Sequence, residues 1–143
     1  MSLLNCGIIE LPKILDVRGN LTFIEGQNHV PFEVKRTYWI YDVPGGEVRG
    51  GHAYKENEEL IIALSGSFEV VLNDGLKEVR YSLNRSYEGV YICPGIWRQL
   101  ENFSTNSLAL ILASTEFNED DYLRNMDEYN EYKKHRNSQH QSF

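Results

Sequence analysis

Short runs of β-branched and aromatic residues, separated by turn residues, follow one another from about residue 8 to residue 115 of this 143-residue chain. Such residues suit the pleated surface of a strand, whereas Asn, Asp, Gly and Pro favour turns. The clearest turn is Asn73-Asp74-Gly75, which tolerates positive φ and lies between two strand-like runs, as in a β-hairpin. Short, regularly spaced strands favour a sandwich or barrel. We expect strands at 10–15, 20–25, 32–42, 60–64, 68–72, 78–83, 89–93 and 107–114.

Helical periodicity begins only at about residue 118, after the last expected strand. Glu119-Asp120-Asp121 supplies the acidic residues that a helix N-terminus favours. The apolar side of the expected helix consists of Tyr122, Leu123, Met126 and Tyr129. We therefore predict an all-β fold as a single domain over 1–143, with a core at about 8–115 and a short C-terminal helix at about 118–134.

Charge and hydropathy exclude several classes of function. The net charge of −7 disfavours nucleic-acid binding, which needs a basic face. No apolar stretch is long enough to span a membrane, and the sequence starts without a secretion-type segment, so we expect a cytoplasmic protein that does not bind membranes. The spacing of Cys6 and Cys93 indicates neither a disulfide framework nor a zinc knuckle, and Cys93 is expected to be a small buried side chain.

Two segments are similar to the paired metal-binding motifs of cupins, which are small jelly-roll β-barrels. They cover residues 46–54, followed by Glu59, and residues 89–98. A metal-binding cupin carries histidine where this chain has Tyr54 and Arg98. His52 and Glu59 alone are too few ligands for a metal, so we expect no metal site and consider a metal-dependent oxygenase the weakest hypothesis.

The segment Arg49-Gly50-Gly51-His52-Ala53-Tyr54-Lys55 resembles the pattern Arg-Gly-x-His-Ala-His-Lys of the nucleotide-sugar 3,4-ketoisomerases. These are small cupins that act on dTDP-4-keto-6-deoxyglucose. Further stretches resemble the family at 16–21, 30–42, 63–68, 72–75, 89–98 and 112–124. The likeness covers roughly residues 8–130, and the order and spacing of its motifs make it specific. One departure stands out, because the second histidine of the family is Tyr54 here.

The resemblance implies a cupin jelly-roll β-barrel, a homodimer, no metal or other cofactor, and a dTDP-linked 4-keto-6-deoxy sugar bound in the barrel mouth. The implied reaction moves the carbonyl of dTDP-4-keto-6-deoxy-D-glucose from C4 to C3. It gives a dTDP-3-keto-6-deoxyhexose for deoxyamino sugars of surface glycans such as lipopolysaccharide. A gluco-configured product is favoured over a galacto-configured one.

The chemistry of such an isomerisation selects candidate catalytic residues. A base must remove a proton beside the carbonyl, and bases work best with a pKa near the working pH. The ordinary pKa is about 6.5 for histidine and about 10 for tyrosine, so His52 is the stronger base candidate. Tyr54 lies on the same strand face if this segment is extended, where its phenol can donate a proton; as a base it would need a pKa lowered by Arg49 or Arg98. Tyr38 completes the candidate catalytic set.

Arginines and an aromatic residue are the candidate substrate-binding groups. Arg36, Arg49 and Arg98 are candidates for the diphosphate, because a guanidinium group matches phosphate oxygens. Arg18 follows a turn within a family motif and is a candidate for the sugar end. Tyr91 either lines the pocket or belongs to the aromatic core.

Tyr54 also motivates an alternative function from another class. A barrel that has lost its second histidine could act as a non-catalytic cupin module that binds a nucleotide sugar. The sequence leaves open which residue is the base and whether Tyr54 preserves activity. It also leaves open the C4 configuration of the product and whether the nucleotide contains thymidine or another nucleoside.

Overall fold

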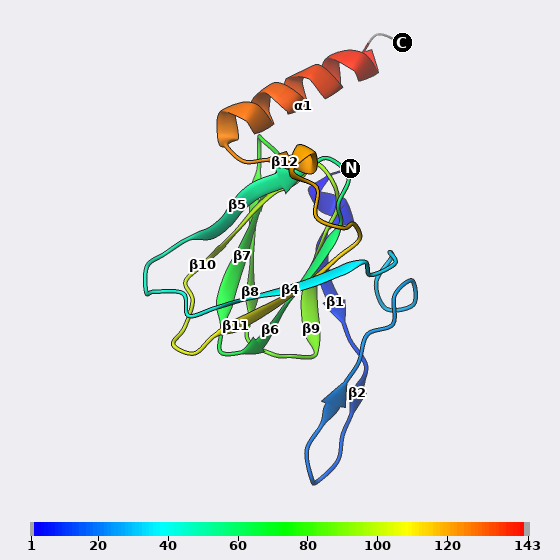
Figure 1. Cartoon of the computed structure of the whole chain (residues 1–143), viewed down its shortest axis with the longest axis vertical. Helices are drawn as coiled ribbons and strands as arrows, with labels where there is room; N and C mark the ends of the chain where they lie inside the picture. The colour runs from blue at the N-terminus through cyan, green and yellow to red at the C-terminus, as the bar shows by residue number, and fades with distance from the viewer. Residues whose placement is uncertain (1, 142–143) are drawn as a thin grey trace.

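Two five-stranded antiparallel sheets face each other in the computed structural model, which describes residues 2–141 (Figure 1). The first sheet has the order β1-β9-β6-β11-β4, and the second has the order β12-β5-β10-β7-β8. The first consists of β1 (Gly7–Glu10), β9 (Glu88–Ile92), β6 (Glu59–Ser65), β11 (Leu108–Ala113) and β4 (Arg36–Tyr41). The second consists of β12 (Tyr122–Leu123), β5 (Arg49–Tyr54), β10 (Trp97–Glu101), β7 (Phe68–Asn73) and β8 (Glu78–Leu83). The predicted all-β fold is confirmed.

A hairpin of β2 (Lys13–Ile14) and β3 (Leu21–Thr22) extends from the body at the end opposite the C-terminal helix (Figure 1). One strand was expected over 10–15, but β1 ends at Glu10 and pairs with β9. Pro12 follows and cannot donate to a strand ladder, which explains the interruption. Strand β8 has the expected bounds, whereas β5 and β10 were not among the expected strands.

The core lies between the two sheets. Ile61 of β6 and Ile111 of β11 are opposite each other in the first sheet, and both are fully buried. They belong to the same hydrophobic cluster as Val70 of β7 and Leu100 of β10 in the second sheet. Because side chains alternate across a strand, the neighbours of these residues point to the outer faces.

The expected helix start at about residue 118 is wrong. The Asn118 side chain accepts a hydrogen bond from the Asp120 amide and caps a single 3-10 turn, η2 (Glu119–Asp121). The next two residues form β12, which pairs with Tyr54 and Ala53 of β5. Pairing with an existing sheet edge therefore prevails over the helical pattern of this segment, and its side chains join the barrel.

The C-terminal helix α1 (Met126–Gln141) starts eight residues later than expected and ends seven residues later. It is anchored on the outside of the second sheet by Tyr129, which is fully buried. The Tyr129 ring lies 5.8 Å from the Trp97 ring, and its hydroxyl donates to the Gly95 carbonyl at 2.9 Å. Within residues 2–141, no helix has the length and apolar character needed to cross a membrane.

Candidate active site

A buried ion pair joins the two sheets inside the barrel. Arg98 of β10 and Glu59 of β6 each have side chains only 1% exposed, and Arg98 Nε and Nη2 lie 2.9 and 2.8 Å from Glu59 Oε1. Arg98 Nη1 donates to the Gly50 carbonyl at 3.0 Å, and Nη2 donates to the Tyr38 hydroxyl at 2.8 Å. The Tyr38 hydroxyl in turn donates to Glu59 Oε2. The guanidinium group is thus held by partners from β4, β5 and β6.

The protonation states of this cluster follow from burial and from the ion pair. Burial alone disfavours the charged guanidinium group, but Glu59 and then Tyr38 hold the pKa of Arg98 above its ordinary value. Burial is also the main cause of the raised pKa of Tyr38. Arg98 therefore remains a cation, and Tyr38 remains a neutral phenol at any physiological pH.

Gly50 permits the close approach of Arg98. Its φ is +68°, a conformation that L side chains rarely adopt, and a Cβ at this position would overlap Arg98 Nη1. The glycine in the Arg49-Gly50-Gly51 segment thus has a physical reason: only glycine leaves room for the guanidinium group against the β5 backbone.

Strand β5 presents His52 and Tyr54 to the same side. His52 lies opposite Arg98 in the β5–β10 register, and its ring is 4.8 Å from the Tyr54 ring in an edge-on arrangement. Tyr122 of β12 completes an aromatic group, with its ring 5.1 Å from His52 and 4.6 Å from Tyr54. The Tyr54 hydroxyl donates to the Tyr122 hydroxyl at 3.2 Å. Sequence reasoning did not identify Tyr122, since a two-residue strand shows no periodicity.

His52 is kept neutral by its surroundings. Burial, followed by the positive charges of Arg98, Arg124 and Arg36, lowers the pKa of His52 from 6.5 to about 2. A neutral imidazole has a free lone pair, which a general base requires, although its affinity for a proton is low in the unliganded site.

Tyr54 remains protonated. Burial and then Glu59 raise its pKa, and the opposing effect of Arg98 is smaller. Tyr54 could act as a base only if its pKa were lowered. Because its surroundings raise the pKa instead, Tyr54 does not meet this condition. Its phenol can act as a hydrogen-bond and proton donor.

Two buried polar atoms beside this cluster lack a hydrogen-bond partner among the described residues: Nε2 of His52 and Nε of Arg36. The Arg36 guanidinium group lies 5.5 Å from the centre of the Tyr38 ring, and the positive charge of Arg36 contributes to the lowered pKa of His52. Leaving such atoms unsatisfied is costly, so a ligand with polar groups would be stabilised here. Both side chains are only partly buried, but these two nitrogen atoms are not themselves exposed, so a ligand reaches them only when the side chains move.

The structure thus brings together five of the eight predicted site residues: Arg36, Tyr38, His52, Tyr54 and Arg98. Arg49 lies exposed at the first position of β5. Arg18 lies in the turn between β2 and β3, where its side chain is 87% exposed and pairs with Asp16 at 2.9 Å. Within this chain, therefore, Arg18 is not brought near His52.

Tyr91 points away from the cluster around His52. It is opposite Leu60 in the β9–β6 register, so it points to the outer face of the first sheet, away from Glu59. Its hydroxyl donates to Glu58 Oε1 at 2.5 Å, and its ring stacks on Phe32. The expectation that Tyr91 lines the pocket is corrected by this register, and the alternative of an aromatic packing residue agrees with its surroundings.

The two facing sheets and the polar cluster between them define a small barrel of the cupin type. The RmlC epimerase of Mycobacterium tuberculosis, 16% identical, shares this fold with a TM-score of 0.72 over 87% of this chain and 70% of its own. The family described as "FdtA: WxcM-like, C-terminal" matches residues 4–134. The chain belongs to this family.

Curated and solved relatives agree with this assignment. The chain is similar to a TDP-4-oxo-6-deoxy-α-D-glucose-3,4-oxoisomerase of Aneurinibacillus thermoaerophilus, with 38% identity over 87% of this chain and 90% of the relative. The 3,4-ketoisomerase QdtA of Thermoanaerobacterium thermosaccharolyticum, solved with TDP, has 37% identity and a TM-score of 0.90 over 94% and 98% of the two chains. The TDP-quinovose 3,4-ketoisomerase WlaRB of Campylobacter jejuni has 42% identity and a TM-score of 0.83 over 87% and 96%. The chain is an isomerase.

The lowered pKa of His52 predicts a pH dependence of stability. Between pH about 2 and 6.5 the unfolded chain binds a proton at His52 and the folded chain does not, so stability falls as the pH drops below 6.5. This contribution is at most about 1.4 kcal/mol per pH unit. Urea unfolding of the wild type and of His52→Gln at about pH 7.5 and about pH 5.5 measures it. The wild type should lose more stability than the variant, and equal losses would contradict the assignment.

The close contact between Gly50 and Arg98 predicts that Gly50→Ala destabilises the fold by more than about 2 kcal/mol, since it adds a steric overlap to a strained φ. Gly46→Ala is the matched control, because Gly46 also has a positive φ of +85° but nothing lies within 4 Å of its Cβ position. The control variant should lose only the stability that replacing glycine at a positive φ costs, without the cost of a steric overlap. Similar unfolding midpoints for the two variants would show that the Arg98 contact does not require glycine.

Proposed function

We propose that this chain is a TDP-sugar 3,4-ketoisomerase that converts dTDP-4-keto-6-deoxy-D-glucose to a dTDP-3-keto-6-deoxyhexose without a metal. The observation that carries the proposal is the juxtaposition of the neutral His52 imidazole, the protonated phenol of Tyr54 and the Arg98 cation. An enediolate pathway needs all three: a proton acceptor, a proton donor and a positive charge near the developing oxyanion. The names of the relatives support the same reaction.

In the proposed mechanism, His52 removes the proton from C3 of the sugar. The positive charge of Arg98 then stabilises the negative charge that develops on the oxygen atoms, while the Tyr38 hydroxyl, which accepts from Arg98 and donates to Glu59, holds the guanidinium group in place. A bound diphosphate would occupy the free Nε of Arg36 and offset its positive charge. Burial is the main cause of the low pKa of His52 and the charge of Arg36 is the last of four, so the diphosphate would remove one of the smaller contributions that oppose protonation of the imidazole.

Tyr54 acts in this scheme as the donor that returns a proton to C4, while the hydroxyl proton on the C3 oxygen moves to the C4 oxygen and the proton taken by His52 leaves to solvent. Tyr122 accepts the Tyr54 hydroxyl hydrogen bond at 3.2 Å and is only partly buried. For Tyr54 to donate to the sugar, this hydrogen bond reverses, so that the Tyr122 hydroxyl donates to Tyr54 and replaces its proton from solvent.

The sugar and the nucleotide are the finer parts of the proposal. We favour a gluco-configured product, because the relative with 42% identity is named for TDP-quinovose, the 6-deoxy sugar of gluco configuration. We favour thymidine because relatives act on or bind TDP compounds. The product would serve deoxyamino-sugar biosynthesis for surface glycans, and a cytoplasmic location remains the prediction from composition.

One observation favours the second candidate, a module that binds a nucleotide sugar without turnover. The pKa of about 2 makes His52 a weak proton acceptor in the free site, and Tyr54 supplies no second imidazole. Binding would still satisfy the free polar atoms of Arg36 and His52.

Incubation with dTDP-4-keto-6-deoxyglucose in deuterated water, followed by NMR, separates the two functions. An isomerase exchanges the C3 proton and forms the 3-keto product, whose coupling constants report gluco or galacto configuration. Turnover by His52→Asn should fall by about 10²–10⁴-fold with substrate binding retained in calorimetry. A wild type that binds but is inert, beside a Tyr54→His variant that turns over, would establish the binding module. Absence of binding and turnover would reject both.

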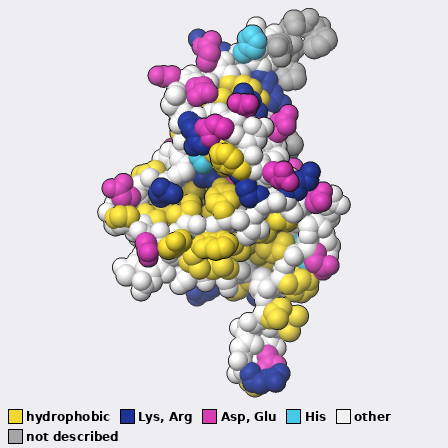
Figure 2. All heavy atoms as spheres, in the orientation of Figure 1, with side chains coloured by type: hydrophobic (Ala, Val, Ile, Leu, Met, Phe, Trp, Pro, Cys, Tyr) yellow, Lys and Arg dark blue, Asp and Glu magenta, His cyan; other side chains and the backbone are white. Residues whose placement is uncertain are grey.

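We further propose that the chain forms a homodimer through the outer face of the first sheet. Figure 2 shows hydrophobic side chains gathered across the face on which β4 lies. Trp39, Tyr41 and Leu64 are 58%, 62% and 44% exposed there, and hairpin residues Leu15 and Val17 are exposed as well. An apolar area of this kind on a globular domain marks an interaction surface.

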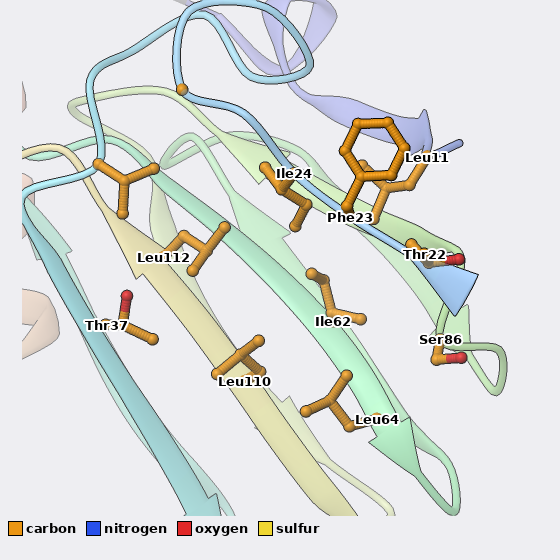
Figure 3. Close-up of a pocket in the computed structure, with 12 residues that line it drawn as sticks. Leu11, Thr22, Phe23, Ile24, Thr37, Ile62, Leu64, Ser86, Leu110 and Leu112 are labelled. Carbon is orange, nitrogen blue, oxygen red and sulfur yellow. The ribbon is translucent and has the colours of Figure 1, made fainter. Parts of the chain in front are cut away.

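A groove of about 520 Å³ lies on this face between the sheet and the segment that contains β3 (Figure 3). Ile62, Leu64, Leu110 and Leu112 form its floor, and Phe23 and Ile24 form its rim. The groove is on the opposite side of the first sheet from Glu59, so it is separate from the catalytic cluster. The apolar hairpin of a second copy is the occupant that we propose, an arrangement that would also carry Arg18 to the partner.

The dimer predicts a mass in solution of about twice 16.6 kDa by light scattering. Leu64→Glu places a charge on the proposed interface and should give monomers, because an unpaired charge is costly to bury. Leu76→Glu is the control, since Leu76 is 95% exposed in the turn between β7 and β8. This variant should remain dimeric. A monomeric wild type would reject the proposed dimer without bearing on the chemistry of His52.

A further inference from the structure

The two cysteines, 87 residues apart in sequence, are in contact. Their Sγ atoms lie 3.0 Å apart, about 1 Å more than the roughly 2.05 Å of a disulfide bond. Cys6 precedes β1 and Cys93 follows β9, and the antiparallel pairing of these strands, with Gly7 opposite Tyr91, brings the thiols together. The backbone amide of Cys93 also donates to Cys6 Sγ at 3.4 Å. Both are free thiols.

The two thiols differ in exposure and in ionisation. Cys93 is only 1% exposed, whereas Cys6 is partly exposed. The hydrogen bond from the Cys93 thiol lowers the pKa of Cys6 to about 7, and the same contact, with burial, raises the pKa of Cys93. The contact thus favours ionisation of Cys6 over ionisation of Cys93, and the thiolate is the reactive form of cysteine.

We propose that Cys6 and Cys93 form a redox-modification site, which closes to a disulfide on reaction with a low-molecular-weight disulfide such as oxidised glutathione. The Cys6 thiolate attacks one glutathione sulfur, which forms a mixed disulfide and releases one glutathione thiolate. Cys93, deprotonated as it reacts, then attacks Cys6 Sγ, forms the protein disulfide and releases the second glutathione. The two cysteines are oxidised, the glutathione disulfide is reduced, and the two thiol protons end on the released glutathiones.

The position of this pair predicts its effect. Strand β1 is at the edge of the first sheet, where β9 is its one neighbour in the sheet order. A bond between residues 6 and 93 would join the start of β1 to the end of β9 and close a long loop, which restricts the unfolded chain. The inference rests on this contact alone and is independent of the proposed isomerase activity.

Exposure of the native, reduced protein to oxidised glutathione tests the proposal. The wild type should lose the mass of two hydrogen atoms and both reactive thiols, and peptide mapping should join Cys6 to Cys93. Its thermal midpoint should rise by roughly 5–15 °C and return on reduction. Retention of both thiols, a mixed disulfide that does not close, or dimers that separate on reduction would each overturn the proposal.

Single variants distinguish the roles of the two thiols. Cys93→Ser should stop at the mixed disulfide and gain one glutathione, whereas Cys6→Ser should react at least about 10-fold more slowly, because its remaining thiol is buried. Equal rates in the two variants would overturn the assignment of Cys6 as the nucleophile. Where circular dichroism shows that a variant is unfolded, the rate of closure of the wild type between about pH 6 and about pH 8 decides instead, since it should rise with the thiolate fraction of Cys6.

Discussion

The ion pair between Arg98 and Glu59 is the interaction on which the rest of the site depends. Removing two charges from water is costly, and their attraction compensates only when the geometry is good and the remaining polar atoms are bonded. Here the Gly50 carbonyl and the Tyr38 hydroxyl accept hydrogen bonds from the guanidinium nitrogen atoms Nη1 and Nη2 of Arg98, in addition to the bonds that Glu59 accepts. Because the two charges come from different sheets, the pair also constrains how the sheets face each other.

Burial and one buried cation together set the arrangement of protons in the site. Burial and then Arg98 oppose protonation of His52, while burial, against the smaller effect of Arg98, keeps the hydroxyls of Tyr38 and Tyr54 neutral. The site therefore holds a proton acceptor and proton donors at the same pH, a separation of roles that is set by the environment. Without Glu59, Arg98 would be an uncompensated buried charge, so the electrostatics of the site and the stability of the barrel share one cause.

The sequence predicts well what depends on local patterns. Alternation and turn residues identify most strands. What it misses depends on pairing between distant segments. The outward direction of Tyr91 follows from its register with Leu60, the position of Tyr122 from a two-residue strand on β5, and the contact of Cys6 with Cys93 from the pairing of β1 with β9.

Tyr54 is where the sequence departs from its family, and the structure suggests how the departure can be tolerated. A histidine at this position would add a second group able to accept a proton, whereas the buried phenol can only donate. In the proposed mechanism the proton acceptor is His52, which is the one imidazole in the aromatic group. The phenol has a hydrogen-bond partner in Tyr122, whose hydroxyl accepts from Tyr54 and links it to the partly exposed side of the site. A site with one acceptor and a linked pair of donors remains sufficient for moving a proton between adjacent carbons, because each transfer needs only one of them at a time.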